Sequence, residues 1–281
     1  MMTVDTQADY RKNRATLSYG LIGFGRIGQR VVRCLAAKNG SPTLVAVLVR
    51  PEQKAAAEAA LGASLVHTSI NSFLAIESAV TIECASATAL RNYGISILSS
   101  GSDLLPLSLA ALTDRDFETD LFAAATRGPG RLEIPAGAMG SIDFLSAARE
   151  DALRSVVFRA TYPAARWRGT VAEEMIDLEN LTSANCFYRS TVREAVIKFP
   201  RHINVAVGVA LAGLGLDDTR VELCANPLIT QATFEVEAEA GPGPARLTIY
   251  GRNAGLGADP IDYTTFSLVR ALCRRTDRVI V

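Results

Sequence analysis

A glycine-rich turn near the start of the chain is the first feature that could do chemistry. Gly23, Gly25 and Gly28 form a G-x-G-x-x-G pattern that begins within the apolar run 19–24, and they open a helix-like stretch, 26–37. In that context the glycines allow a tight turn, close approach of a diphosphate and close packing of the helix on a sheet. The exposed N–H groups of such a helix start attract phosphate charge. The pattern predicts a dinucleotide site, and the alternative is a glycine-rich turn in an empty doubly wound domain. The residues expected to bind the cofactor here are Gly23, Phe24, Gly25, Arg26, Ile27 and Gly28.

Arg50 indicates which dinucleotide is expected. It ends the run VLVR after the second predicted strand, where an acidic side chain would normally bind the ribose 2′-hydroxyl of NAD. A guanidinium at this place suits a 2′-phosphate, because it offers positive charge and a bidentate fork. We therefore expect NADP or NAD as cofactor, with NADP used at least as well as NAD. The alternative is that Arg50 is a solvated charge at a strand end.

Composition excludes several classes of protein. The 281 residues carry 29 Lys+Arg against 29 Asp+Glu, which argues against a partner bound through a general basic field, nucleic acid included. Hydrophobic residues make up 49%, so global disorder is excluded, and no apolar run approaches the roughly 18 residues that a membrane span needs. Five dispersed cysteines and a polar N-terminus favour a cytoplasmic protein with reduced thiols. Two histidines argue against a metal site.

The order of predicted elements indicates an α/β fold. After a tail, 1–17, buried strands at 44–49, 81–85, 95–98 and 132–135 alternate with helical segments, including a long one at 105–124. This alternation predicts an N-terminal Rossmann-type parallel-sheet domain over 18–150. Strands at 156–162, 221–224, 233–238 and 247–250, with a hairpin turn at 241–244, predict a C-terminal α+β domain over 151–281. A closing helix at about 262–275 could pack back on the first domain.

Several segments together resemble the L-aspartate dehydrogenases. They are GFGRIG at 23–28, IECAS at 82–86, SSGSDLLPLSLAALTD at 99–114, IPAGAMGSIDFLSAA at 134–148 and FPRHINVAVGVALAGLGLDDTRV at 199–221. The resemblance implies reversible oxidative deamination of L-aspartate with NAD or NADP, and a homodimer formed through the C-terminal sheet. It also implies that the backbone of Ala138 lies at the nicotinamide and that Asn204 contacts it. A helix-start cap is the alternative role for Asn204.

Two segments depart from the family pattern. The family's acid/base histidine lies in a strand motif N-x-H-E-I, and here Phe234 occupies that position. The family motif N-P-[KR]-T-S is replaced by Asp259-Pro-Ile261-Asp262-Tyr263, which removes a cation and adds acids. An acidic pocket disfavours a dicarboxylate and favours an amine, a cation or a neutral substrate.

Three hypotheses follow from these departures. In the first, the chain is a dehydrogenase or imine reductase for an altered small-molecule substrate, with a proton supplied by Tyr263, Asp262, Asp259 or His202. In the second, it is an aspartate dehydrogenase whose proton passes through water or His202. In the third, it binds the cofactor without catalysis. A neutral, hydrogen-bonded structural role is the alternative for His202.

Overall fold

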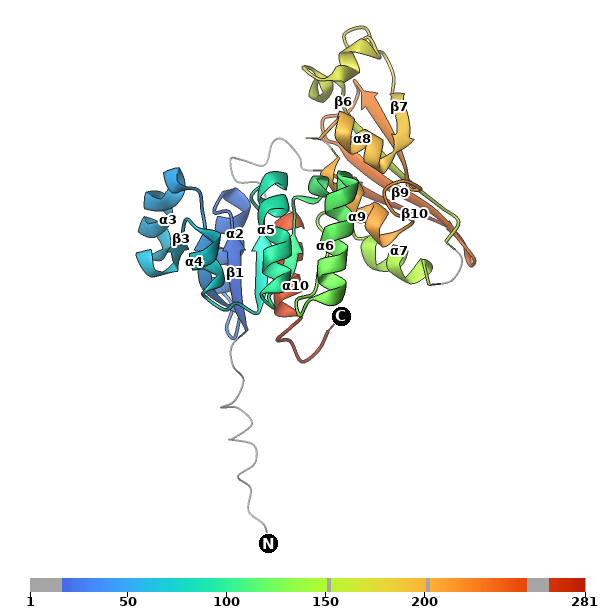
Figure 1. The fold of residues 1–281 in the computed structure, drawn as a ribbon. Helices are drawn as coiled ribbons and strands as arrows, with labels where there is room; N and C mark the ends of the chain where they lie inside the picture. Colours follow the sequence, from blue (N-terminus) through green and yellow to red (C-terminus); the bar gives the residue numbers. More distant parts are fainter. Residues whose placement is uncertain (1–16, 151–152, 201–202, 252–262, 281) are drawn as a thin grey trace.

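The N-terminal part of the chain is a parallel sheet with helices on both faces (Figure 1). The computed structural model describes residues 17–150, 153–200, 203–251 and 263–280. Within them, strands β1 (Ser18–Ile22), β2 (Thr43–Leu48), β3 (Val66–His67), β4 (Val80–Glu83) and β5 (Asp103–Pro106) form one sheet in the order β3-β2-β1-β4-β5. Every pairing is parallel. The order reverses between β1 and β4, and ligands of such sheets bind at the carboxyl ends of the strands at that reversal.

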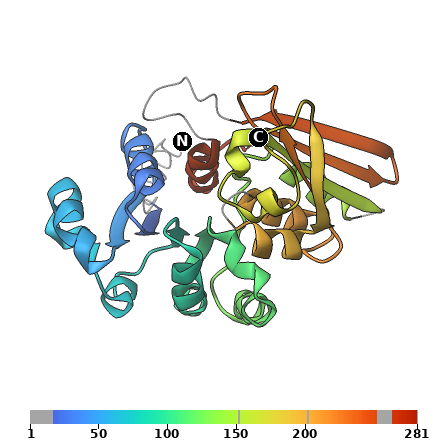
Figure 2. The same ribbon diagram turned by 90° about the horizontal axis from the view of Figure 1, so that it is seen from above.

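Alternating side chains of these strands pack against different helices. Tyr19 and Leu21 of β1 face a core shared with α2 (Arg26–Ala36) and α10 (Tyr263–Cys273), whereas Ile22 faces the opposite core. On that opposite side lie α5 (Ala87–Ser99), α6 (Arg115–Arg127) and α4 (Ile70–Leu74) (Figure 1). Helix α3 (Lys54–Leu61) packs through Ala57 into the core of α2 and α10. Helix α10 therefore returns from the end of the chain to pack beside α2 (Figure 2).

The C-terminal part is a mixed sheet with helices on one face. Strands β6 (Ser155–Pro163), β7 (Asn185–Thr191), β8 (Arg220–Asn226), β9 (Thr233–Ala240) and β10 (Gly243–Tyr250) lie in the order β10-β9-β6-β8-β7. Strands β6 and β8 are parallel, and the other pairs are antiparallel, including the β9–β10 hairpin. Helices α7 (Ile142–Ala148), α8 (Val192–Lys198) and α9 (Asn204–Ala212) cover the apolar face, and their core is continuous with that of the first domain. The α/β class and both predicted sheets are thus confirmed.

The outer face of this second sheet carries charged residues. The Arg159 guanidinium contacts the carboxylates of Glu222 at 2.7 Å, Glu237 at 3.2 Å and Glu235 at 3.4 Å. Arg189 also pairs with Glu222, at 3.1 Å. Alternation along β6, β8 and β9 places these side chains opposite the helix-covered face.

Three predicted elements are wrong in type or extent. Residues 95–98 lie inside α5 and not in a strand, because Leu90, Gly94, Ile97 and Leu98 recur at helical spacing and form its buried side. The helix expected at 105–124 is instead β5, a 3₁₀ turn η3 (Leu109–Thr113) and α6, which Asp114 caps by accepting a hydrogen bond from the Phe117 N–H. The strand expected at 132–135 is reduced to a single bridge between Leu132 and Leu104.

The expectation that all cysteines are reduced is also wrong. Cys186 of β7 and Cys224 of β8 form a disulfide, whereas Cys34, Cys84 and Cys273 are free. The two partners are 38 residues apart in the chain, but the antiparallel register of β7 and β8 places them directly opposite each other. Spacing along the sequence does not reveal such a register. In the described part of the chain, none of the helices has the length and apolar character needed to span a membrane.

Candidate functional site

The glycine turn has the backbone that a close-approaching ligand requires. Gly23 has φ of +93°, and a Cβ there would lie 2.8 Å from the Ala85 Cβ. A Cβ on Gly28 would lie 2.5 Å from the carbonyl oxygen of Gly23. A Cβ on Gly25, in contrast, would meet no described atom within 4 Å. The first and third glycines are therefore needed by the fold itself, whereas the second keeps an open space in front of the turn.

That open space lies at the N-terminus of α2. Gly25 is the N-cap residue of this 11-residue helix, and its first turn, starting at Arg26 and Ile27, contains no acidic side chain. The helix start therefore presents backbone N–H groups and the positive end of the helix dipole without a side-chain cap. A dinucleotide diphosphate fits this arrangement of backbone groups.

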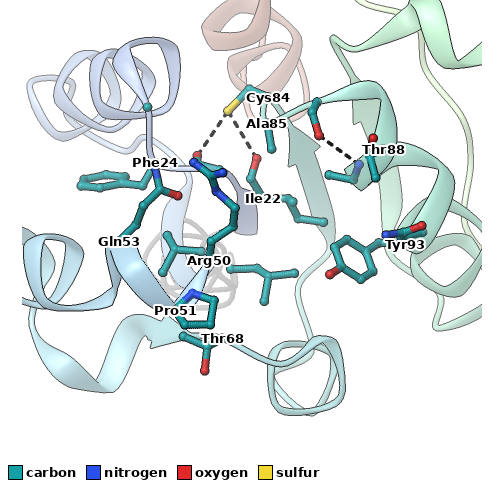
Figure 3. A pocket seen from close by; sticks show the side chains of 17 residues that line it. Ile22, Phe24, Arg50, Pro51, Gln53, Thr68, Cys84, Ala85, Thr88 and Tyr93 are labelled. Carbon is teal, nitrogen blue, oxygen red and sulfur yellow. Dashed lines mark hydrogen bonds between the residues drawn. The ribbon is translucent and has the colours of Figure 1, made fainter.

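A cavity of about 440 Å³ opens beside the turn. Its lining comes from the carboxyl ends of β1, β2 and β4 and from the start of α5, as Figure 3 shows for the labelled side chains. The lining residues are Ile22, Gly23, Phe24, Gly25, Leu48, Val49, Arg50, Pro51, Gln53, Thr68, Cys84, Ala85, Ser86, Thr88, Ala89, Asn92 and Tyr93. Four of these residues were not expected from the sequence. Gln53 and Thr68 come after the carboxyl ends of β2 and β3, and Asn92 and Tyr93 lie on α5.

Arg50 lies at this cavity, where the sequence analysis expects a ribose-binding residue. It directly precedes a 3₁₀ turn, η1 (Pro51–Gln53), and its side chain is 74% exposed. Its Nε lies 3.3 Å from the Glu52 carboxylate. Because both side chains are well exposed, this ion pair is weak and the guanidinium can turn toward a phosphate.

Cys84 ties the glycine turn to the neighbouring strand end. Its thiol donates weak hydrogen bonds to the carbonyl oxygens of Ile22, at 3.5 Å, and Gly23, at 3.4 Å (Figure 3). Burial and, secondarily, the charge of Glu83 raise the pKa of Cys84 well above its usual range, so this thiol remains protonated. It acts as a packing group and not as a nucleophile.

Glu83, the last residue of β4, is a fully buried carboxylate at the same edge. It accepts hydrogen bonds from the N–H groups of Ala85 at 2.7 Å, Ser86 at 2.9 Å and Ser108 at 3.1 Å, and from the Ser108 hydroxyl at 2.9 Å. Burial raises the pKa of Glu83, and these hydrogen bonds oppose that rise. The donors belong to the loops that follow β4 and β5.

A second cavity, of about 580 Å³, lies where the two domains meet α10. Ala138 and Tyr263, two residues that sequence analysis singled out, both line it. Its lining is mainly apolar and consists of Ala136, Gly137, Ala138, Met139, Gly140, Thr248, Ile249, Tyr250, Tyr263, Phe266, Ser267 and Arg270. The Tyr263 side chain is largely exposed, so its hydroxyl is accessible to a ligand in this cavity.

Phe234 lies beside this second cavity and belongs to an aromatic cluster. It pairs in register with Ile249, which lines the cavity. Its ring stacks on Phe158 with centroids 6.2 Å apart and meets the Tyr162 ring edge-on at 5.6 Å. Tyr162 in turn contacts Trp167 edge-on at 5.3 Å, and burial raises the pKa of Tyr162 to about 12. Phe234 therefore supplies an apolar ring next to Ile249 and no proton.

Asn204 does not have the helix-cap role that was one of its two expected roles. It is the first residue of α9, and Ile203 is the N-cap. Its amide donates to the Leu107 carbonyl at 2.7 Å and accepts from the Ala110 N–H at 2.8 Å. Asn204 therefore connects α9 to the loop after β5 and is not an N-cap. Whether it also contacts a nicotinamide stays a prediction.

The remaining expected catalytic residues, His202, Asp262 and Asp259, lie outside the described residues. Within the described ranges, no group of three or more His, Cys, Asp or Glu side chains is arranged to hold a metal ion.

Comparison with known proteins assigns the N-terminal and C-terminal parts of the chain to a family. The model for the NAD-binding domain of homoserine dehydrogenase matches residues 23–135, and the model for the C-terminal domain of aspartate dehydrogenase matches residues 143–275. The L-aspartate dehydrogenase of Cupriavidus taiwanensis is 34% identical over 94% of this chain and all of its own length. That of Brucella anthropi is 35% identical over 93% of this chain and 97% of its own. The chain belongs to the aspartate dehydrogenase family.

The fold agrees with this assignment. The crystal structure of aspartate dehydrogenase from Thermotoga maritima superposes with a TM-score of 0.74 at 22% identity, and the match covers 94% of this chain and 99% of that one. As a member of the aspartate dehydrogenase family, the chain is an NAD-binding oxidoreductase, of an enzyme class that acts on CH–NH₂ donors. The resemblance read from its motifs is thereby confirmed.

Proposed function

We propose that this family member acts on the C–N bond of an amino acid, amine or imine other than aspartate, with NADP or NAD as cofactor. The observation that supports the proposal is the environment of Phe234. The position that the resemblance gives to an acid/base histidine here holds a phenyl ring packed between Phe158 and Tyr162. General acid–base help is typically worth about 10²–10⁴-fold in rate, so its loss at this position requires a different proton donor or a different substrate.

In this proposal, residues of the first cavity bind the cofactor, and residues of the second cavity bind the substrate and transfer its proton. The N–H groups at the start of α2 would hold the diphosphate, Arg50 would hold a 2′-phosphate, and the backbone at Ala138 would border the nicotinamide. The chemistry that a nicotinamide cofactor would supply here is hydride exchange with the carbon of the C–N bond. Ile249, which pairs in register with Phe234, excludes water from one wall of the substrate cavity. Tyr263, which lines the same cavity, holds the proton that goes to or from the substrate nitrogen.

Tyr263 and Tyr250 allow a matched test of the proton donor. Both line the second cavity, and they are 65% and 63% exposed. We expect Tyr263→Phe to lower kcat by about 10²-fold or more, whereas Tyr250→Phe changes it by less than about threefold. Equal effects of the two substitutions would show that the hydroxyls only shape the cavity. In that case His202→Gln and Asp262→Asn test the other two candidates by the same measurement.

A substrate panel tests the reaction itself. Purified protein is mixed with reduced or oxidised NADP or NAD and with L-aspartate, oxaloacetate plus ammonia, or a series of neutral and cationic amines and imines. The absorbance of the reduced nicotinamide is followed. Turnover of an amine or imine at a rate on the order of 1–10³ s⁻¹, with little turnover of aspartate, is the expected result. Because the relatives are L-aspartate dehydrogenases, efficient turnover of aspartate is the second candidate, and it would refute the altered substrate. Cofactor binding without turnover of any compound would indicate a protein that has lost catalysis.

Phe234→His separates the two causes of an altered substrate. If only the proton donor has changed, a histidine at position 234 should create measurable aspartate oxidation. If the 259–263 segment no longer accepts a dicarboxylate, the variant should remain inactive toward aspartate while folding normally. Phe158→His is the control, because the Phe158 ring stacks on that of Phe234 and the substitution places an imidazole in the same aromatic cluster.

A homodimer is part of the proposal, because the resemblance implies one formed through the C-terminal sheet. The outer face of that sheet carries the ion pairs around Arg159, whereas α7, α8 and α9, among the described residues, cover its apolar face. Light scattering should give twice the 29.9 kDa mass of a single chain. A mass of one chain at micromolar concentration would refute the dimer.

A further inference from the structure

The loop that leaves β5 is held from both domains at once. On one side, the Leu107 N–H donates to the Glu83 carbonyl at 2.8 Å, and Ser108 donates its N–H and hydroxyl to the Glu83 carboxylate. On the other side, Asn204 of α9 binds the Leu107 carbonyl and the Ala110 N–H. Residues 107–110, the β5 loop, are thus fixed between a buried strand end of the first domain and a helix start of the second.

The same carboxylate also fixes the loop that borders the first cavity. Its Oε1 accepts from Ala85 and Ser86, and both of these residues line that cavity. Glu83 therefore has one oxygen bonded mainly to the β4 loop and the other, Oε2, bonded to the Ser108 N–H of the β5 loop. Because every one of these contacts comes from a donor, an ionised carboxylate satisfies all of them together.

The position of the β5 loop indicates which half of the dinucleotide it serves. In a sheet of the order 3-2-1-4-5, the two halves of a dinucleotide lie on opposite sides of the reversal between the first and fourth strands. The first cavity, with Arg50, lies on the β1–β2 side and at the β4 loop. The β5 loop follows the carboxyl end of the outer strand on the other side. By the rule for such sheets, it is the part of the edge where the nicotinamide half would lie.

We propose that Glu83 and Asn204 are positioning residues, which hold the β5 loop from two sides and thereby set the nicotinamide half of the bound dinucleotide. Asn204 acts in this way through Leu107 and Ala110. The inference rests on dinucleotide binding alone and does not depend on the identity of the substrate.

The Glu83→Gln variant distinguishes the contribution of the β5 loop from that of the β4 loop. An amide placed with its oxygen at the Oε1 position keeps the bonds from Ala85, Ser86 and the Ser108 hydroxyl, but its NH₂ then faces the Ser108 N–H, donor against donor. The experiment compares the affinity for NADPH, measured by its fluorescence, with the affinity for 2′-phospho-ADP-ribose, which lacks the nicotinamide, measured by competition. We expect Glu83→Gln to weaken the binding of NADPH by about 10–100-fold, since hydrogen bonds to charged groups are worth about 1.5–3 kcal/mol. The affinity for 2′-phospho-ADP-ribose should fall by less than about threefold.

Thr81→Val is the matched control. Thr81 lies two residues earlier in β4, is also fully buried, and bonds the Ser102 hydroxyl at 2.9 Å, away from the carboxyl end of the sheet. This variant removes a buried hydrogen bond from the same strand, so it should lower the melting temperature without changing the ratio of the two affinities. A change in that ratio with Thr81→Val would overturn the proposal, because any loss of β4 stability would then act in the same way.

A double-mutant cycle tests whether both residues act through one loop. Ser108→Ala and Asn204→Ala each loosen the β5 loop from a different side, so their combined loss of NADPH affinity should be clearly smaller than the product of the single losses. Losses that multiply, or single variants that weaken both ligands equally, would refute a shared positioning role. This cycle decides the question even if Glu83→Gln does not fold.

Discussion

Gly25 offers a test in which stability and cofactor affinity should move in opposite directions. The residue is the N-cap of α2 with φ −78° and ψ −165°, an extended backbone that any residue adopts. A Cβ at this position meets no described atom within 4 Å. Aspartate is among the preferred N-cap residues, and its charge interacts favourably with the positive end of the helix. Gly25→Asp should therefore fit the fold without strain.

The expected magnitudes follow from this geometry. The cap and the dipole interaction together should stabilise the unliganded protein by about 0.5–1 kcal/mol. For a chain of this size, that corresponds to a rise in melting temperature of about 1–4 °C. The same carboxylate would occupy the space of the diphosphate, and each pair of like charges about 4 Å apart costs about 4 kcal/mol at an effective dielectric constant near 20. Even after screening by salt, affinity for NADH and NADPH should fall by at least about 100-fold.

Two measurements on the same samples check this expectation. Thermal melts without cofactor measure the stability that the helix cap adds. Calorimetric titration with NADH and NADPH measures the affinity of the diphosphate site. Gly25→Ala is the control, since it adds a Cβ without charge or capping group, and it should lose a little stability and less affinity than the aspartate variant. An aspartate variant that binds either cofactor as tightly as the wild type would refute the placement of the diphosphate at this helix start.

Two further predictions concern charges. Arg50→Ala should weaken NADPH about tenfold more than NADH, because a charge-assisted contact to the 2′-phosphate is lost, and an unchanged preference in titration would remove Arg50 from cofactor selection. The hydrogen bond from Arg193 holds the pKa of Asp217 below its usual range, assisted by the nearby charge of Arg115. A lowered folded-state pKa means that the pair stabilises the fold above about pH 3.9, the unfolded value, and that this stabilisation is lost as pH falls through the lowered pKa. The difference in urea midpoint between wild type and Asp217→Asn should therefore be present at neutral pH and shrink in acid, and a difference independent of pH would contradict it.

The features that sequence analysis predicted well are those specified by neighbours in the chain. The glycine pattern, the strand before it and the helix after it lie within about twenty residues, so their context could be read directly. The position of Arg50 followed from the end of a single buried run. The β9–β10 hairpin likewise followed from its turn residues and the alternation beside them.

The features that sequence analysis missed depend on packing between distant segments. Residues 95–98 are apolar enough for a buried strand, and only the packing of α5 shows that they belong to one side of a helix. The disulfide of Cys186 and Cys224 depends on the register of two strands. Asn204 could be assigned a cap or a cofactor contact from its own segment. Its bonds to Leu107 and Ala110 join residues nearly a hundred positions apart.

The two cavities are formed by different parts of the chain, backbone in the first and side chains in the second. This difference would let a family member keep its cofactor while its reaction changes, as proposed above. The dinucleotide cavity is built largely from backbone, with a positive φ at Gly23 and uncapped N–H groups at Gly25, so most side-chain substitutions nearby leave it intact. The second cavity takes its chemistry from side chains on Ile249, Tyr263 and the neighbouring Phe234. A histidine and a phenylalanine can occupy the same inward position of β9 without altering its pairing, because strand pairing uses only the backbone. In the function proposed above, substitution there would change proton transfer and substrate fit while the sheet, the interdomain contacts and the diphosphate site remain as they were.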